Sequence, residues 1–485
     1  MPPPVARALV FFTSAAVLVL EIMAGRLMAP FLGVTLETFT GIIGTVLAGI
    51  ALGSWVGGRA ADRYDPRGLL GPVLVVGGLG AVAAPPIVDA LGPAMRAGGP
   101  IEIVLLTVLG FFLPAAVLST VTPIVVKIRL HDLAETGSVV GSYSATATAG
   151  AIFGTFVTGF LLVATLPSRP ILWVVGGLLV GGGVAVTARP SRSSGLVRLL
   201  VVAVPSVGLL QLVPSPCDTE TAYYCARITT EPDRATARVL WLDTLRHSYV
   251  DLADPTYLGF RYARLFGDVF TTRLPQGAVD GLYVGGGGFT LPRYLDALHP
   301  GGRHLALELD PSLVDLAQNE LGLSLDGPIE VAIGDARLTL EDAPDDGFDV
   351  VIGDAFGGPS VPWHLTTREF VSAIRTKLRD GGIYILNMID YPPLGFATAE
   401  AATIASVFDH LLVLAPREYL DGEDGGNFVI AGSDAPFDAT AISALSRDRQ
   451  EPAIALTGPD AVAWIGGADV LTDDFAPVDQ LITTP

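Results

Sequence analysis

The 485-residue sequence has little of what builds metal sites, because it contains only two cysteines and six scattered histidines. Cys217 and Cys225 do not form a Cys-x-x-Cys pair, and structural zinc needs four closely spaced Cys or His ligands. The sequence therefore predicts no metal. Basic residues are also scarce, with 29 Lys and Arg against 49 Asp and Glu, a net charge of −20. This charge disfavours nucleic acid and suits either cationic ligands or a merely solubilising surface.

The charges are unevenly distributed along the chain. Residues 1–215 hold 12 basic and 8 acidic side chains, whereas residues 216–485 hold 17 and 41. Seven apolar segments in the first part are long enough to cross a bilayer, which takes about 20 residues. They cover approximately residues 8–25, 39–58, 69–91, 101–121, 139–163, 170–188 and 196–213. We therefore expect a polytopic transmembrane domain over residues 1–215, with the lipid bilayer as a partner, followed by an acidic soluble part.

The loop charges predict the orientation of this domain. Nine basic residues lie in loops on the side of the N-terminus, and three lie on the other side. The positive-inside rule places the N-terminus in the cytoplasm, and seven spans would then place the soluble part outside the cytoplasmic membrane. Cys217 and Cys225, just after the last span, could form a disulfide there; two unpaired thiols are the alternative. Near the end of the first span, Glu21 is expected to pair with Arg26.

Residues 216–276 are expected to form a small β-rich region, since 237–243 combines Val, Leu and Trp in the manner of a strand. From residue 277 to 485 the chain alternates strands and helices. Strand 281–284 ends in four consecutive glycines, followed by a helix, and backbone without Cβ atoms lets a ligand approach the helix N-terminus. These glycines are Gly285, Gly286, Gly287 and Gly288.

Carboxylates follow the next strands in the same way. Glu308 comes 20 residues after Gly288, a spacing that suits an acid binding ribose hydroxyls. Asp335 and Asp354 follow strands 329–333 and 348–352, and open α/β sheets bind ligands at such carboxyl ends. Together with a predicted final hairpin of strands 411–415 and 427–431, this pattern is typical of the Rossmann-like class I methyltransferase fold.

Four segments, at 284–291, 307–311, 334–336 and 348–354, resemble the successive motifs of spermidine synthases. They are the sequences VGGGGFTL, LELDP, GDA and FDVVIGD. The chain is similar, more closely, to bacterial proteins in which such a domain follows membrane helices. That likeness is carried by residues 246–251, 354–356 and 471–478.

The resemblance implies an S-adenosyl nucleotide as co-substrate, either decarboxylated S-adenosylmethionine or S-adenosylmethionine, and a small cationic amine as acceptor. It implies that the glycine turn lies on the sulfonium side of the nucleotide. The implied roles are Glu308 for the ribose, Asp335 with Ala336 for the adenine, His247 near the nucleotide, Asp354 as the catalytic carboxylate, and Tyr249 and Asp251 on the acceptor side. Capping of the following loop is the alternative role for Asp354.

The sequence departs from the family at two acids. The family turn reads Gly-Gly-Gly-Asp-Gly-Gly, and its aspartate falls on Gly287; a second family carboxylate falls on Gly357. The usual Tyr-His-Glu near the amine site is also absent, with only Tyr257 and Tyr262 nearby. These losses would suit a bulkier or less cationic acceptor.

Three functions thus stay open: a membrane-bound aminopropyl or alkyl transferase of polyamine biosynthesis, a methyltransferase, and a transporter or sensor that binds a nucleoside or polyamine without chemistry. A homo-oligomer is compatible with each. One tension concerns location, because sulfonium nucleotides are made in the cytoplasm whereas the loop charges predict an external soluble part.

Overall fold

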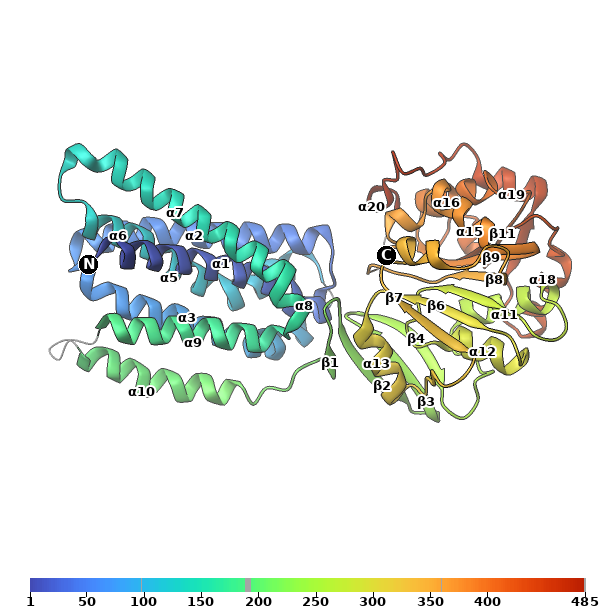
Figure 1. Ribbon diagram of the computed structural model, residues 1–485, viewed down its shortest axis with the longest axis horizontal. Helices are drawn as coiled ribbons and strands as arrows, with labels where there is room; N and C mark the ends of the chain where they lie inside the picture. The colour runs from blue at the N-terminus through green and yellow to red at the C-terminus, as the bar shows by residue number, and fades with distance from the viewer. Residues whose placement is uncertain (97, 188–192, 359, 484–485) are drawn as a thin grey trace. The chain divides into compact units, whose positions relative to one another are not determined.

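The computed structural model describes residues 1–96, 98–187, 193–358 and 360–483 (Figure 1). The chain folds into two compact units. The helical unit comprises Met1–Arg227 with Leu242–Thr244, and the α/β unit comprises Ile228–Trp241 with Leu245–Pro485. Residues 216–227, expected within the β-rich region, thus belong to the helical unit.

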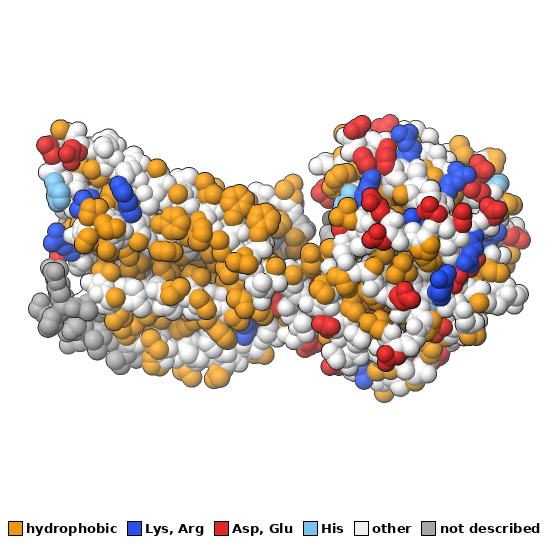
Figure 2. Space-filling view, viewed as in Figure 1, with side chains coloured by type: hydrophobic (Ala, Val, Ile, Leu, Met, Phe, Trp, Pro, Cys, Tyr) orange, Lys and Arg blue, Asp and Glu red, His pale blue; other side chains and the backbone are white. Residues whose placement is uncertain are grey.

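Long apolar helices make up the helical unit, as its hydrophobic surface in Figure 2 shows. Among the described residues, six segments are long and apolar enough to cross a membrane. They are Pro3–Leu32, Leu36–Arg63, Pro66–Met95, Pro100–Arg129, Leu133–Thr165 and Ser168–Thr187. A multi-span helical domain is therefore confirmed. The seventh predicted segment, 196–213, overlaps helix α10, whose side chains at 193–199, 201 and 202 lie outside the described residues, as do Arg189 and Arg192.

These spans contain the following elements: α1 Pro3–Leu32, α2 Leu36–Arg63, α3 Pro66–Leu91, η1 Gly92–Met95, α4 Pro100–Thr107, η2 Val108–Phe112, α5 Leu113–Ser119, α6 Val121–Arg129, η3 Leu133–Glu135, α7 Thr136–Val157, η4 Thr158–Leu162, α8 Val163–Thr165, α9 Ser168–Thr187 and α10 Ser193–Leu210. The helix widens into a π turn at η2 because Pro114, just after it, has no N–H to donate to the preceding turn.

Glycines bring neighbouring helices of this unit into backbone contact. A Cβ on Gly150 of α7 would lie 2.2 Å from the carbonyl oxygen of Phe11 in α1, and one on Gly154 would lie 2.5 Å from that of Ala15. Glycines 53 and 57 of α2 approach the backbone at Ala116 and Thr120 in the same way. Small residues therefore set the helix spacing, as is common in membranes.

The segment after α10 is tied to the helix ends. Strand β1 (Thr219–Glu220) pairs antiparallel with the start of β2 (Cys225–Glu231), and a disulfide joins Cys217 to Cys225 with their Cα atoms 5.1 Å apart. Glu220 accepts a hydrogen bond from the Ser168 N–H at 3.0 Å and binds Arg26. The expected pairing of Arg26 with Glu21 is therefore wrong: its guanidinium reaches the later segment instead.

Two sheets are present beyond the helices. The first has the order β1-β2-β3-β4, with β3 at Arg234–Leu242 and β4 at Leu245–Asp251. The second has the order β12-β10-β11-β9-β8-β5-β6-β7. Its strands are β5 Gly281–Val284, β6 His304–Glu308, β7 Ile329–Ile333, β8 Phe348–Gly353, β9 Leu378–Asp390, β10 His410–Ala415, β11 Gly426–Ser433 and β12 Ile454–Thr457.

Strands β7, β6, β5, β8 and β9 are parallel, and β11, β10 and β12 continue the sheet antiparallel. The predicted hairpin is thus confirmed, with β11 inserted between β9 and β10. Helices α11 and α12 pack on one face of the sheet and α15 and α16 on the other (Figure 1). This is the Rossmann-like class I methyltransferase fold; the edge strand β12 was not predicted.

The helices of the α/β unit are α11 Arg261–Arg273, α12 Thr290–Leu298, α13 Pro311–Glu320, α14 Ala336–Thr339, η5 Leu340–Asp342, η6 Trp363–Leu365, α15 Arg368–Lys377, α16 Gly395–Ala405, α17 Arg417–Leu420, α18 Ala439–Asp448, α19 Gly458–Ile465 and α20 Val478–Leu481. The chain runs outward from β5 to β7 and then returns to β8 on the other side of β5. This reversal between β5 and β8 is the topological switch point, where ligands of open α/β sheets bind.

Candidate functional site

The switch point brings the glycine turn beside Asp354. Val284 is opposite Gly353 in the parallel register of β5 and β8, so the next residues of both strands leave the sheet side by side. A Cβ on Gly285, whose φ is +96°, would lie 2.6 Å from the carbonyl oxygen of Asp354. Only glycine fits this approach without a backbone shift.

Glu308 lies at the end of the neighbouring strand β6 and contacts the same turn. Its Oε2 accepts hydrogen bonds from the N–H groups of Gly286 at 2.9 Å and Gly287 at 3.1 Å, and its Oε1 accepts one from Asp310 at 2.9 Å. The residue is 6% exposed. Oε2 is thus filled and Oε1 keeps one accepting position for a ligand hydroxyl, because a carboxylate offers about two acceptor positions on each oxygen.

Asp335 lies beyond β7 and begins α14. Its Oδ1 accepts a hydrogen bond from the Arg337 N–H at 2.8 Å, and its Oδ2 lies 3.1 Å from Nε2 of His364. Ala336 is buried directly behind it. The carboxylate is thus held in place by the helix N-terminus, and His364 is a neighbour that the sequence did not indicate.

His247 and Ser248 on β4 border the glycine turn from the other side. Ser248 Oγ accepts a hydrogen bond from the Gly288 N–H at 2.9 Å. A Cβ on Gly287 would lie 3.6 Å from Nδ1 of His247 and 2.9 Å from the Ser248 oxygen. Burial lowers the pKa of His247 to about 4, so the imidazole is neutral at physiological pH.

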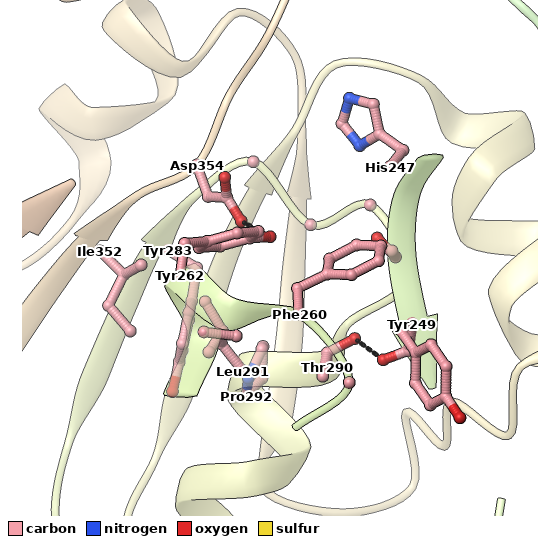
Figure 3. Close-up of a pocket in the computed structure, with 16 residues that line it drawn as sticks. His247, Tyr249, Phe260, Tyr262, Tyr283, Thr290, Leu291, Pro292, Ile352 and Asp354 are labelled. Atoms are coloured by element: carbon pink, nitrogen blue, oxygen red, sulfur yellow. Dashed lines mark hydrogen bonds between the residues drawn. The ribbon is translucent and has the colours of Figure 1, made fainter. Parts of the chain in front are cut away.

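Tyr249 and Asp251 were expected on the acceptor side. The Tyr249 carbonyl accepts a hydrogen bond from the Thr290 hydroxyl (Figure 3). The Tyr249 ring packs against Tyr257 and Phe260. Asp251 lines neither of the two cavities that border Asp354. Burial favours its neutral form, but hydrogen bonds from Arg234 and nearby N–H groups lower its pKa to about 2. The structure thus gives Asp251 local hydrogen-bonding partners rather than a place beside Asp354.

Asp354 is the centre of a half-buried hydrogen-bond network. The hydroxyl of Tyr262 donates to its Oδ2 at 2.9 Å, and Nδ2 of Asn387 donates to its Oδ1 at 3.0 Å (Figure 3 shows the tyrosine bond). Asn427 donates in turn to the Asn387 oxygen at 2.8 Å. Burial raises the pKa of Asp354 to about 6, although both of its donors lower it. In the described part of the chain Asp354 accepts no backbone N–H bond, which disfavours a capping role.

Two cavities meet at this carboxylate. The first, about 30 Å³, lies under the glycine turn and has room for about one water molecule. The second, about 300 Å³, also borders Asp354. His247, Phe260, Tyr262 and Asp354 line both. The second cavity is completed by Leu245, Arg246, Arg261, Phe356, Asn387, Ile389 and Asn427.

Both glycines that replace family acids lie near this region. Gly287 has a φ of +51°, which aspartate tolerates better than most residues. Gly357 donates its N–H to the Ser360 carbonyl at 2.8 Å, and a Cβ there would meet nothing closer than 3.8 Å. Neither position is closed to an acid by the fold. Across the described residues, no group of three His, Cys, Asp or Glu side chains could hold a metal.

No family model matches the chain. It is 27% identical over 215 residues to the polyamine aminopropyltransferase of Vibrio vulnificus, which covers 41% of this chain and 69% of that protein. It is also 27% identical over 232 residues to a probable polyamine aminopropyl transferase of Bifidobacterium longum, 43% of this chain and half of that protein.

A methyltransferase and a solved structure also match the chain. The eEF1A lysine and N-terminal methyltransferase of Xenopus laevis is 28% identical over 125 residues, 24% of this chain and 18% of that protein. The crystal structure of a probable spermidine synthase from Corynebacterium glutamicum matches with 25% identity and a TM-score of 0.49, covering 54% of this chain and 96% of that one. In sequence, the chain therefore resembles the polyamine aminopropyltransferases and, over a shorter stretch, methyltransferases.

Proposed function

We propose that the α/β unit binds an S-adenosyl nucleotide and transfers an alkyl group from it, most simply aminopropyl, to an amine held beside Asp354. The observation that carries this proposal is the position of Asp354, a half-buried carboxylate shared by two cavities and placed at the switch point. The names of the relatives supply the reaction class, since aminopropyltransferases and methyltransferases both use S-adenosyl donors.

The polar groups at the strand ends fit the nucleotide. Glu308, whose Oε1 keeps one free acceptor position, would bind a ribose hydroxyl, and Asp335 with Ala336 would border the adenine. The close backbone approach at Gly285–Gly288 would admit the sulfonium side of the ligand, next to the neutral His247. The first cavity is too small for a nucleotide, so these groups at the strand ends would hold it.

The donor supplies an electrophilic carbon next to its positively charged sulfur. In the proposed step, the lone pair of a neutral amine forms the new carbon–nitrogen bond while the carbon–sulfur bond breaks, leaving a neutral thioether. The ammonium product then releases a proton to Asp354, whose pKa of about 6 leaves it ionised at neutral pH. Tyr262 and Asn387 hold this carboxylate in one orientation through their hydrogen bonds.

Product mass tests the proposal and separates its variants. Full-length protein in detergent is incubated with an amine mixture and either decarboxylated S-adenosylmethionine or S-adenosylmethionine. A mass gain of one aminopropyl group supports the first function. A gain of one methyl group supports methyl transfer, which the glycines at 287 and 357 favour because they remove acids suited to a polyamine. Nucleotide binding without turnover of either donor would support a sensor or transporter.

We also propose that the helical unit lies in the bilayer with its N-terminus in the cytoplasm and the α/β unit outside. The side on which the α/β unit lies depends on whether α10 crosses the membrane. With six spans the N-terminus and the α/β unit would lie on the same side, and with α10 as a seventh span they would lie on opposite sides. Reporter fusions to the C-terminus locate it directly. Alkylation of Cys217 and Cys225 with and without reductant, after acid quenching, is a second test of the location. Two free thiols would contradict an oxidising compartment outside the cytoplasm.

A further inference from the structure

We infer that the acceptor is an amine carrying an anionic group, most simply a carboxylate, at its far end, and that Arg261 and Arg246 recognise that group. This inference rests on the proposed function, because it names the substrate class for the second cavity. The inferred acceptor differs from a diamine at only one end, because its amine would still bind beside Asp354.

The lining of the second cavity has more basic than acidic side chains, whereas residues 216–485 as a whole have more acidic ones. Residues 216–485 hold 41 acidic and 17 basic side chains, and acidic side chains are spread over the α/β unit in Figure 2. The lining of the cavity, all of it described, nevertheless contains two arginines and a single acid, Asp354. His247 adds no charge because burial lowers its pKa to about 4. A second ammonium would therefore meet cations rather than carboxylates.

Arg261 has the least compensated charge of the two arginines. Among the described residues, its guanidinium donates only to the carbonyl oxygen of Pro452, at 2.9 Å, and its buried Nε has no partner. It is also the first residue of α11, whose first turn contains no acid. A cation at a helix N-terminus opposes the helix dipole. The position thus costs stability, and an anionic ligand would offset that cost.

Arg246 also lines the cavity, and its charge is partly neutralised. Its Nη2 binds Oε1 of Glu231 at 2.6 Å, and its guanidinium carbon lies 5.5 Å from the ring centre of Phe260. Glu231 does not line the cavity. Because a guanidinium has five N–H donors, a ligand carboxylate can still be bound.

Other residues of the cavity lining suit the amine end of the acceptor. Asp354, Asn387 and Asn427 form its hydrogen-bond network, and the aromatic rings of Tyr262 and Phe356 lie beside it. Aromatic faces and a carboxylate together favour an amine that can be protonated. The lining of this one cavity thus combines groups that bind an amine with groups that bind an anion, which complements a molecule that carries both.

Three probes of similar length test this complementarity: 5-aminopentanoate, cadaverine and pentylamine, which end in a carboxylate, an ammonium and a methyl group. Binding to full-length protein in detergent is measured by calorimetry with and without 5′-methylthioadenosine. We expect 5-aminopentanoate to bind at least about tenfold more tightly than cadaverine, as for a charge-assisted hydrogen bond. Equal or tighter binding of cadaverine, or no binding of 5-aminopentanoate, would overturn the inference.

Arginine variants locate the anion site. Arg261→Gln should weaken 5-aminopentanoate about 10- to 100-fold and leave pentylamine unchanged, with a smaller effect for Arg246→Gln. Arg417→Gln, an exposed arginine on α17 outside the cavity, is the matched control and should change neither. A preference that survives Arg261→Gln and Arg246→Gln would also contradict the inference. Binding of 5′-methylthioadenosine, read in the same samples, reports separately on the proposed nucleotide site.

Discussion

The proposed nucleotide side and the proposed acceptor side of the site are held in place by different partners. On the nucleotide side, Glu308 and Asp335 accept hydrogen bonds from backbone N–H groups of the turns that they adjoin. On the acceptor side, Asp354 is bound by the side chains of Tyr262 and Asn387, and Asn387 by Asn427. The first arrangement follows from the path of the chain, whereas the second requires matched side chains from separate elements. The acceptor side is therefore the half in which single substitutions can change specificity while the fold is retained.

The largest expected effect concerns the acceptor side. Asp354→Asn should lower turnover about 10²- to 10⁴-fold, because an amide cannot accept the proton, while nucleotide affinity stays near wild type. Turnover with the donor found by product mass and calorimetry with 5′-methylthioadenosine measure the two quantities. Asp424→Asn, in the loop before β11, is the control. Near-normal turnover by Asp354→Asn would remove this residue from the chemistry.

The reciprocal experiment addresses the nucleotide side. Glu308→Gln keeps the shape of the side chain but loses the charge, and we expect nucleotide affinity to fall by about 1.5–3 kcal/mol, as for hydrogen bonds to charged groups. Calorimetry at fixed salt measures this loss, and the thermal midpoint of the variant checks that the glycine turn still folds. If affinity is unchanged, the ribose assignment is wrong and the nucleotide lies elsewhere.

The pH dependence of turnover sharpens the contrast, since burial raises the pKa of Asp354 to about 6. Turnover needs its ionised form, so the rate should fall as pH drops through about 6, by about tenfold per unit below it. Tyr262→Phe removes a donor that lowers this pKa, so the midpoint should move upward. Rate profiles of both proteins measure the shift; identical midpoints would assign the titration to another group.

Restoring the family acids should produce the smallest effect. Gly357→Asp places a carboxylate where a Cβ has open space, and we expect cadaverine to bind about 2- to 10-fold more tightly through an added hydrogen bond. Gly287→Asp should gain less, because its Cβ would lie 2.9 Å from Ser248 Oγ and that side chain must move. Calorimetry with cadaverine compares both variants with wild type. Weaker binding would show that these positions do not face the acceptor.

The same contrast explains what the sequence could predict. Gly285–Gly288, Glu308 and Asp335 follow buried strands directly, so the alternation of strands and helices is enough to place them at one edge of the sheet. Tyr262 and Asn387 are 92 and 33 residues from Asp354, and only tertiary packing brings them to it. The boundary between the units was also not predictable from composition, because residues 216–227 are polar yet bind the helix ends through Glu220.

The shared wall of the two cavities has a thermodynamic consequence. His247, Phe260, Tyr262 and Asp354 border both spaces, so a ligand that moves any of them on one side changes the free energy of filling the other. Such coupling is reciprocal: if the nucleotide tightens acceptor binding by some factor, the acceptor tightens nucleotide binding by the same factor. Direct transfer from a nucleotide at the strand ends to an acceptor at Asp354 also requires both substrates at once. We therefore expect a ternary complex, seen as intersecting double-reciprocal plots, rather than a reaction that releases one product before the second substrate binds.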